Sequence, residues 1–414
     1  MRVAVVGGGV IGLACAYSLM QRGADVTLLE RDRCGRAASR GNTGWIVPAL
    51  SIPLQAPGVV GGALRGILAK DSPLKIKPTL DPKFLRWSWR FWRNCTAEQY
   101  LAGTRAMVAL GAQCFELYEE MQADGVRFAI QSTGMVAAGT TPEGIGAWQE
   151  MVEGSRAQGY RGGCQALDAA EVRALEPALS SAVVGGIYAQ SERYVRPEEL
   201  TSGLTGRLRE SGVRIAEGAK VRRLSRGPGG SWRVELAGET VSADAVVLAA
   251  GIWSRRLLAR LGRDILLEAA KGYSVTAGGK GTVPTHALYL CEARVGCSTY
   301  GGELRLAGIF DLTGLDLSLG EQRIASRMRM SLPFFADWRP RDVSLRWAGL
   351  RPYTPDGLPV IGSVPGRDRL VVATGHGRMG ITVAPPTGDA VAELVLEGRT
   401  RPEIEPFGIE RVLA

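Results

Sequence analysis

Histidine is nearly absent from this chain of 414 residues, which contains only His286 and His376. Many protein metal sites and most nucleophile triads need histidine as a ligand or as a general base. We therefore expect no histidine-based metal centre, no bound metal and no serine-histidine-aspartate triad.

Cysteines and long apolar runs are also sparse. Seven cysteines form an odd set without the closely spaced pairs of a zinc site, so neither a zinc site nor a disulfide framework is predicted. No apolar stretch reaches transmembrane length, and the chain enters a β-like run at once, without a basic and apolar leader. These absences predict a cytoplasmic protein that no transmembrane helix anchors.

The charge lacks a concentrated basic segment. The formal net charge is +9, from 50 Lys and Arg against 41 Asp and Glu, but no long basic run carries interleaved aromatic residues. This argues against a nucleic-acid partner. A mild basic excess suits an anionic small molecule or an anionic lipid surface, and composition does not distinguish these. The length and the 45% hydrophobic fraction predict a globular protein of two or three domains.

The amino terminus carries a dinucleotide-binding pattern. An apolar run at 2–6 leads into the glycine segment 7–12, a helical periodicity follows, and a second apolar run at 25–29 ends at Glu30. In such a unit the first glycine permits a tight turn, the second admits a pyrophosphate to the helix amino terminus, and the third allows close packing. Glu30 suits the hydroxyls of an adenosine ribose and would repel a 2′-phosphate, which disfavours NADP. The cofactor-binding residues predicted here are Gly7, Gly9, Val10, Ile11, Gly12, Glu30 and Arg31.

Further segments are placed along the same extended cofactor. A loop-like arm at 34–62 contributes Ser39, Asn42, Thr43 and Gly44. Strands are predicted at 220–224, which includes Val221, and at 245–250. The second is a buried strand that ends in Ala250 and Gly251, where a nucleotide-binding sheet meets its ligand.

The middle of the chain has no phosphate signature. Residues 80–95 show helical spacing with one aromatic and one cationic face, which fits either packing on the protein or contact with a membrane interface. Other predicted helices are 97–123, 142–157, 197–210 and 319–330, and predicted strands include 126–130, 134–138, 213–216 and 232–236. A hairpin is predicted around the glycines at 301–302.

The most specific run is RWAGLRPYTPDGLPVIG at 346–362, followed by TGHGRMG at 374–380. Here the chain resembles the D-amino-acid oxidase superfamily of FAD-dependent oxidoreductases over nearly its whole length. Lys271-Gly272-Tyr273-Ser274 and Leu80-Asp81-Pro82 resemble the bacterial D-amino-acid dehydrogenase branch, whereas the stretch at 375–385 is more similar to glycine and sarcosine oxidases.

The resemblance implies an α/β fold with a Rossmann-like FAD-binding domain, a doubly wound parallel sheet. It also implies a second, α+β substrate domain built on a mostly antiparallel sheet. We expect 1–60, 190–262 and 345–414 in the FAD domain, and 61–189 and 263–344 in the substrate domain.

The resemblance also implies site residues. Arg351 would bind the substrate carboxylate, since a planar guanidinium grips a carboxylate through two parallel hydrogen bonds. Tyr273 and Tyr353 are candidates to orient the substrate, and His376 lies beside the flavin ring in a role that is either structural or chemical. A helix at 381–397 would direct its positive end at the ring. The flavin-facing residues predicted are Gly375, Gly377, Arg378, Met379, Gly380, Ile381 and Thr382.

The implied reaction is oxidative deamination of an amino or small imino acid, most simply a D-amino acid. Its α-hydrogen leaves as hydride to flavin N5, and water hydrolyses the imine to a 2-oxo acid. Glycine, sarcosine and a cyclic imino acid such as a proline derivative are the alternatives. A 2-hydroxy acid is disfavoured because its hydroxyl needs a base, usually histidine. A non-catalytic flavin-binding subunit is a third hypothesis. Oxygen and a quinone both stay open as electron acceptors, as do peripheral contact with the inner face of a membrane and the oligomeric state.

Overall fold

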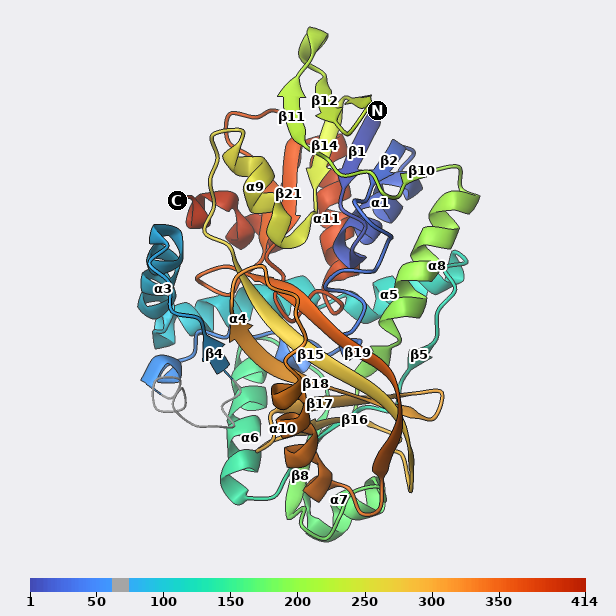
Figure 1. Ribbon diagram of the computed structural model, residues 1–414, viewed down its shortest axis with the longest axis vertical. Helices are drawn as coiled ribbons and strands as arrows, with labels where there is room; N and C mark the ends of the chain where they lie inside the picture. The colour runs from blue at the N-terminus through green and yellow to red at the C-terminus, as the bar shows by residue number, and fades with distance from the viewer. Residues whose placement is uncertain (62–73) are drawn as a thin grey trace.

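A computed structural model describes residues 1–61 and 74–414, and two main sheets divide the molecule between its upper and lower halves (Figure 1). The six-stranded sheet in the upper half contains β10 (Arg214–Ala216), β2 (Asp25–Leu29), β1 (Arg2–Val6), β14 (Ala245–Leu248), β21 (Leu370–Thr374) and β20 (Val360–Ser363), in that order. All neighbours pair in parallel except β20 with β21. Buried apolar strands of this kind need cover on both faces.

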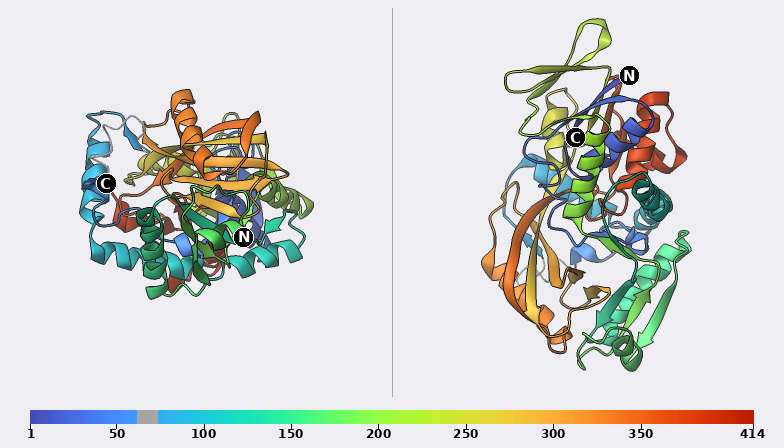
Figure 2. Two further views of the ribbon diagram at one scale, coloured as in Figure 1. Left: turned by 90° about the horizontal axis from the view of Figure 1, so that it is seen from below. Right: turned by 90° about the vertical axis from the view of Figure 1, so that its right-hand side faces the viewer.

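Alternate residues of this sheet enter two different cores. Val3 and Val5 of β1 pack in the core that contains helices α1 (Val10–Gln21), α8 (Pro197–Glu210) and α11 (Ala384–Glu397). Ala4 and Val6 pack in the core on the opposite face, with α9 (Ser254–Ala259) and the small sheet of β11 (Arg223–Arg226), β12 (Trp232–Glu235) and β13 (Thr240–Ala243). This small sheet projects at the end of the molecule that holds the N-terminus (Figures 1 and 2).

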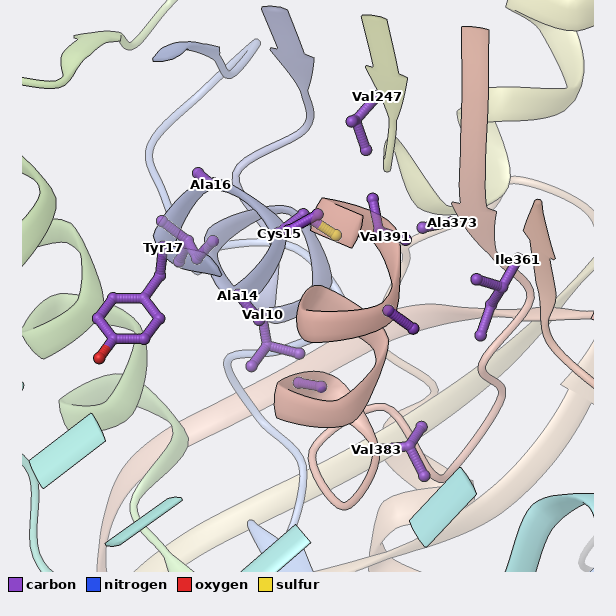
Figure 3. Packing of buried hydrophobic residues seen from close by; sticks show 14 of the residues in the cluster. Val10, Ala14, Cys15, Ala16, Tyr17, Val247, Ile361, Ala373, Val383 and Val391 are labelled. Atoms are coloured by element: carbon purple, nitrogen blue, oxygen red, sulfur yellow. The ribbon is translucent and has the colours of Figure 1, made fainter. Parts of the chain in front are cut away.

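Helices α1 and α11 cross at close range beneath the sheet (Figure 3). The contact depends on Gly388, because a Cβ there would lie 2.6 Å from the carbonyl carbon and oxygen of Ala14. The carboxy-terminal helix is therefore packed directly on the helix that follows the amino-terminal glycine segment.

The second sheet is mostly antiparallel, and nine of its strands lie in residues 1–61 and 74–414. Its main path is β19 (Arg339–Tyr353), β15 (Glu268–Lys280), β18 (Glu303–Leu312), β17 (Val295–Tyr300), β16 (Ala287–Leu290), β6 (Met135–Gly139), β8 (Gly185–Ala189) and β7 (Cys164–Asp168), while β4 (Leu74–Ile76) pairs with β18. Among the strand pairs that the structure describes in this sheet, only β16–β6 and β18–β4 are parallel. The remaining short strands β3 (Trp45–Ile46), β9 (Arg193–Val195) and β5 (Ile130–Gln131) form a separate sheet. The predicted fold class, with a parallel and a mostly antiparallel sheet, is confirmed.

The remaining helices of the described residues are α3 (Pro82–Asn94), α4 (Ala97–Gly111), α5 (Cys114–Ala123), α6 (Pro142–Ala157), α7 (Ala169–Leu175) and α10 (Glu321–Ser331). Helices α6, α7 and α10 pack on strands of the second sheet, whereas α5 packs on α11 in the core of the first sheet. Long strand β19 runs through residue 345, the predicted domain boundary, and carries the chain from one half of the molecule to the other (Figure 1). The predicted domain limits themselves stay a prediction.

Several predicted elements have different bounds. The helix predicted at 97–123 is two helices, because the α-helix ends at Gly111, a poor helix former that lies close to Ser51 and Val383. Of the strand predicted at 126–130, only the last residue enters β5, since the Val126 amide instead bonds back to the end of α5. The strand predicted at 220–224 begins at Arg223, and the helix predicted from residue 381 begins at Ala384.

Candidate active site

The glycine segment after β1 has the geometry of an anion-binding turn. Gly7 has a φ of +114°, and a Cβ there would lie 2.4 Å from the Ala249 carbonyl oxygen. A Cβ on Gly12 would lie 1.8 Å from the Gly7 carbonyl oxygen, so both positions require glycine. At Gly9, by contrast, a Cβ would meet only the Ser39 hydroxyl, at 3.5 Å.

The amino terminus of α1 is left open to a ligand. Gly9 caps the helix without a side-chain hydrogen bond, and the first turn, which includes Val10 and Ile11, has no acidic residue. The Val10 amide donates to the Ser39 hydroxyl at 3.0 Å, which ties the arm at 39–44 to this helix end. The positive end of the helix dipole is thus available to an external anion.

Glu30 lies at the end of β2, beside the same turn. One carboxylate oxygen accepts from the Gly8 amide at 2.7 Å and the other from the Asp32 amide at 2.9 Å. Arg31 stacks its guanidinium 3.4 Å above the Trp253 ring. Val221 lies two residues after Ala219, whose amide donates to the Glu30 carbonyl oxygen at 2.7 Å. The structure therefore brings Glu30, Arg31 and Val221 to one end of the turn.

The arm at 39–44 is fixed by its own short side chains. Asn42 donates to the Ser39 carbonyl oxygen and accepts from the Gly44 amide at 2.6 Å. The Thr43 carbonyl oxygen accepts from Ser298 at 2.8 Å and from Tyr300 at 2.5 Å, on β17 of the second sheet. Gly44 is required because a Cβ there would overlap the Val195 carbonyl oxygen. The arm thus connects the helix end of α1 to the second sheet.

The two glycine segments, which lie near opposite ends of the sequence, approach each other at the carboxyl ends of β14 and β21. Ala250 lies against Gly7, and the Gly251 carbonyl oxygen accepts from the Thr374 hydroxyl at 2.9 Å, one residue before Gly375. Because parallel strands end at the same edge, both glycine segments belong to one continuous site.

Turns precede α11, and residues 381–383 belong to them rather than to the first turn of the helix that the sequence predicts from residue 381. Gly375 and Gly377 have positive φ values of 77° and 51°. The Met379 amide donates to the His376 carbonyl oxygen, and the Val383 amide donates to the Met379 carbonyl oxygen. Val383 precedes α11, whose second and third residues are prolines. The helix therefore points at this site from farther away than expected.

Side chains hold this carboxy-terminal loop on the arm and on α5. Thr382 donates to the Trp45 carbonyl oxygen and accepts from the Val47 amide, both at 3.1 Å. The Ile381 carbonyl oxygen accepts from Tyr118 at 2.7 Å. Arg378 is exposed and donates to the Ile52 carbonyl oxygen at 3.3 Å, and Gly380 faces the His376 Cβ.

Arg351 has an unusual environment for a cation. Its guanidinium lies flat on Gly272 of β15, where a Cβ would be 2.2–2.3 Å from three guanidinium atoms. It donates to the Ile309 carbonyl oxygen at 3.1 Å and forms no ion pair with any carboxylate of residues 1–61 or 74–414. Loss of water contact lowers the pKa of Arg351, and the neighbouring Arg378 charge lowers it further. A half-buried cation without an acidic partner among the described residues attracts an anionic ligand.

Ile309 is a strained residue that positions this arginine. It has a φ of +72°, which a β-branched residue rarely adopts, and it lies where β18 carries one extra residue opposite Lys271 and Tyr273. The extra residue turns the Ile309 carbonyl oxygen toward Arg351. Strain of this kind is often found at functional sites. The sequence gives no signal for it, because only the strand pairing reveals the bulge.

The two predicted tyrosines lie on opposite faces of the second sheet. Tyr353 is two residues from Arg351 on β19, and its ring lies against Phe310 and beneath Gly377. Tyr273 adjoins Gly272 on β15, so its side chain points away from Arg351 into the core with Ile324 of α10. Its hydroxyl lies next to Gly320. The structure brings Tyr353 to Arg351 and does not bring Tyr273 there.

His376 is buried and uncharged. Burial lowers its pKa to about 3, and its Nε2 lies 3.3 Å from the Thr387 hydroxyl of α11. At neutral pH this imidazole therefore contributes no positive charge and has little basicity.

Two further polar groups were not predicted. The Nε of Arg40, next to Ser39, is buried and has no hydrogen-bond partner among the described residues. Glu192 is completely buried, accepts hydrogen bonds from Tyr160 and from the Ala49 amide, and has its pKa raised to about 8 by burial. Arg40 belongs to the predicted arm, whereas nothing in the local sequence marks Glu192 as buried.

The arrangement fits an extended dinucleotide. The open helix end and the partnerless Arg40 Nε suit a pyrophosphate, Glu30 suits ribose hydroxyls, and the turns at 375–380 follow at the far end of the site.

Comparisons with known proteins agree with this geometry. A model of the DAO family, described as FAD dependent oxidoreductase, matches residues 2–394. The chain is 33% identical over 415 residues to D-amino acid dehydrogenase 2 of Pseudomonas aeruginosa, covering 99% of this chain and 97% of that protein. It is 32% identical over 423 residues to D-amino acid dehydrogenase of Cereibacter sphaeroides, covering 100% and 96%.

Solved structures share the fold. Glycine oxidase from Geobacillus kaustophilus superposes with a TM-score of 0.77 at 24% identity, over the full length of both chains. L-proline dehydrogenase from P. horikoshii has a TM-score of 0.72 at 17% identity, covering 99% of this chain and 97% of the other. At these identities the likeness concerns the fold alone.

Proposed function

Because this chain belongs to the family of FAD-dependent oxidoreductases, we propose that it oxidises a D-amino acid to an imine, which water hydrolyses to a 2-oxo acid. The family resemblance found in the sequence is confirmed, and FAD is the cofactor. The observation that carries the proposal is Arg351, a half-buried guanidinium that lies against Gly272 and has no acidic partner among the described residues.

Arg351 binds the substrate carboxylate. Gly272 leaves the space in which the guanidinium lies. One guanidinium nitrogen donates to the Ile309 carbonyl oxygen, so the remaining N–H groups are available to the ligand. Two parallel hydrogen bonds then set the direction of the α-carbon. Tyr353 lies on the same face of the sheet as Arg351 and beside Gly377, and we propose that it orients the bound substrate.

The protein does not need a strong base for this reaction. FAD, when bound, supplies the two-electron acceptor for the α-hydrogen. The positive charges of Arg351 and Arg378 disfavour a protonated substrate amine, so the amine reaches its reactive neutral form more readily. His376 is neutral, so it contributes neither a charge nor a strong base beside these arginines.

Residues of the two glycine segments are proposed to hold FAD at its two halves. Gly7, Gly9, Gly12 and Glu30 hold the ADP half, and the loop at 375–382 lies along the ring.

Glycine, sarcosine and cyclic imino acids are the alternative substrates, because the same clamp would bind any of their carboxylates. Oxygen or a quinone accepts the electrons, and we place the protein in the cytoplasm with peripheral contact on the inner face of the membrane. No helix among the described residues is both long and apolar enough to cross a bilayer.

Anaerobic loss of flavin absorbance, screened over D- and L-amino acids, sarcosine and proline derivatives, tests the substrate class. Arg351→Ala should weaken carboxylate binding about 100-fold, because it removes a two-bond, charge-assisted contact with the carboxylate at a half-buried position. Arg346→Ala is the matched control, since Arg346 lies on the same strand, is exposed and pairs with Glu321 at 3.1 Å. Unchanged affinity in Arg351→Ala would remove this arginine from the site.

A further inference from the structure

Arg305 is a charged residue that lies almost completely inside the protein. It belongs to β18, and its side chain is 1% exposed. Its Nε donates to the Thr276 hydroxyl of the neighbouring strand β15 at 2.9 Å, which holds the guanidinium on the sheet. A buried cation is costly unless it is paired and hydrogen-bonded, so the remaining partners of Arg305 show which segments it joins.

Two of these partners belong to the arm at 39–44. One terminal nitrogen of Arg305 donates to the Arg40 carbonyl oxygen at 3.2 Å and to the Asn42 carbonyl oxygen at 3.1 Å. Between these residues, Gly41 lies on the Trp347 ring of β19, since a Cβ there would be 2.2–2.5 Å from three ring atoms. Arg305 therefore fixes the backbone of this part of the arm against the second sheet.

The counter-charge comes from a helix of the first sheet. Glu198, in the first turn of α8, accepts from both terminal nitrogens of Arg305, at 2.8 and 3.2 Å. Helix α8 packs in the same core as α1, the helix with the open amino terminus, and contacts it. A two-bond pair of this kind fixes the plane of the guanidinium, and with it the direction of the bonds to the arm.

The segment that Arg305 holds is next to the anion-binding end of α1. Ser39 precedes it and accepts from the Val10 amide, and the buried Arg40 Nε, which has no hydrogen-bond partner among the described residues, lies within it. Asn42 continues it and accepts from the Gly44 amide. A shift of the carbonyl groups that bind Arg305 would thus move predicted cofactor-binding groups on both sides of them.

We propose that Arg305 is a positioning residue for FAD, which holds the arm in its cofactor-binding shape and thereby sets how tightly FAD is retained. Arg305 acts through the arm backbone, because its own side chain has almost no surface left to meet a ligand. An arm that is already ordered loses less conformational freedom when the cofactor binds. The inference rests on one part of the proposed function, that FAD lies along the arm.

Release of FAD from the full-length holoenzyme tests the proposal without any substrate. Ultrafiltration of serial dilutions, with the freed flavin measured by its fluorescence, gives the dissociation constant. Arg305→Gln should raise this constant about 30-fold, because the charge-assisted bonds to the two arm carbonyls are lost. Arg305→Lys should raise it about five-fold, since an ammonium group keeps the charge opposite Glu198 but does not reproduce the planar set of donors.

Arg207→Gln is the matched control. Arg207 lies on α8, as Glu198 does, and donates two bonds to the Asp124 carboxylate, at 3.0 and 3.1 Å. None of its hydrogen bonds to described residues reaches the arm at 39–44. This variant loses a comparable ion pair, so its FAD dissociation constant should equal that of the parent protein even if its melting temperature is lower.

A purely structural role would lower the melting temperature of Arg305→Gln and leave the FAD dissociation constant of the folded protein unchanged, and this result would overturn the proposal. Equal increases in Arg305→Gln and Arg207→Gln would also overturn it, because general destabilisation would then be the cause. If Arg305→Gln does not fold, parent-like FAD affinity in the folded lysine variant is the refuting result.

The proposed function is measured separately on the same preparations, as anaerobic flavin reduction by D-amino acids in excess FAD. A parent protein that no amino acid reduces would refute the proposed reaction. The FAD dissociation constants of the variants would still decide the role of Arg305, because they are measured without substrate.

Discussion

Gly272 provides a direct test of the proposed role of Arg351 in carboxylate binding, because the Arg351 guanidinium occupies the space where a side chain at position 272 would stand. An alanine Cβ would lie 2.2–2.3 Å from three guanidinium atoms, whereas carbon contacts settle at about 3.5–4.0 Å. The guanidinium must therefore move by more than about 1 Å, and a displacement of this size at a reacting centre costs about 100-fold in rate. We expect Gly272→Ala to lower kcat/KM for the D-amino acid by about 100-fold.

The fold itself should tolerate this change. Gly272 lies in β15 without a positive φ, and the clash is with the movable end of a side chain rather than with backbone. Gly278→Ala is the matched control: it lies on the same strand, and a Cβ there would meet only the Asp342 carbonyl oxygen, at 3.9 Å. Steady-state kinetics with the substrate, together with thermal unfolding, should separate the two variants by activity and not by stability.

A normal kcat/KM in Gly272→Ala would refute the position of Arg351 described above. A loss that is equal in Gly278→Ala would assign the effect to the strand rather than to the arginine. Affinity for a carboxylate competitor should fall with kcat/KM, while affinity for the corresponding neutral amide should change little, because only the carboxylate uses the guanidinium.

Two predictions concern stability. Burial raises the pKa of Glu192 from 4.5 to about 8, so the folded state binds more protons than the unfolded state between these values, and stability falls as pH rises through this window. Between about pH 5.5 and about pH 8.5, the parent protein should therefore lose a few kcal/mol of unfolding free energy relative to Glu192→Gln, as measured by urea unfolding. If the unfolding free energies of the two proteins change with pH in parallel, Glu192 is not a buried titrating carboxyl. Gly388→Ala should lose about 2–3 kcal/mol, because its Cβ would clash with the backbone of Ala14, whereas Gly206→Ala, with open space around it, should be neutral or slightly more stable in the same thermal unfolding assay.

The sequence predicts well what local pattern and glycine chemistry determine. Strands β1 and β2, helix α1 and the position of Glu30 follow from apolar periodicity and from a turn that requires glycine. The hairpin at Gly301 and Gly302 is also confirmed, since both residues have positive φ between β17 and β18.

What depends on strand pairing was not predictable. Tyr273 and Arg351 appear in equally characteristic segments, but the pairing of β15 with β19 places their side chains on opposite faces. The strain at Ile309 arises from a register shift between two strands that are distant in sequence. Glu192 is buried because three segments, at 49, 160 and 192, converge on it. Each of these features requires the tertiary structure.

The electrostatics of the site favour an amine over an alcohol as the group that is oxidised. Two guanidinium groups, Arg351 and Arg378, act on each other, and burial keeps His376 neutral. Such a positive field shifts a bound ammonium toward the neutral amine, whose lone pair assists the loss of the α-hydrogen. A 2-hydroxy acid would gain less, because its hydroxyl stays protonated at neutral pH and needs a base near it. His376, with a pKa of about 3, is a poor base for that proton. In the proposed site, the charges assigned to the carboxylate would therefore also prepare an amino acid, and not a hydroxy acid, for oxidation.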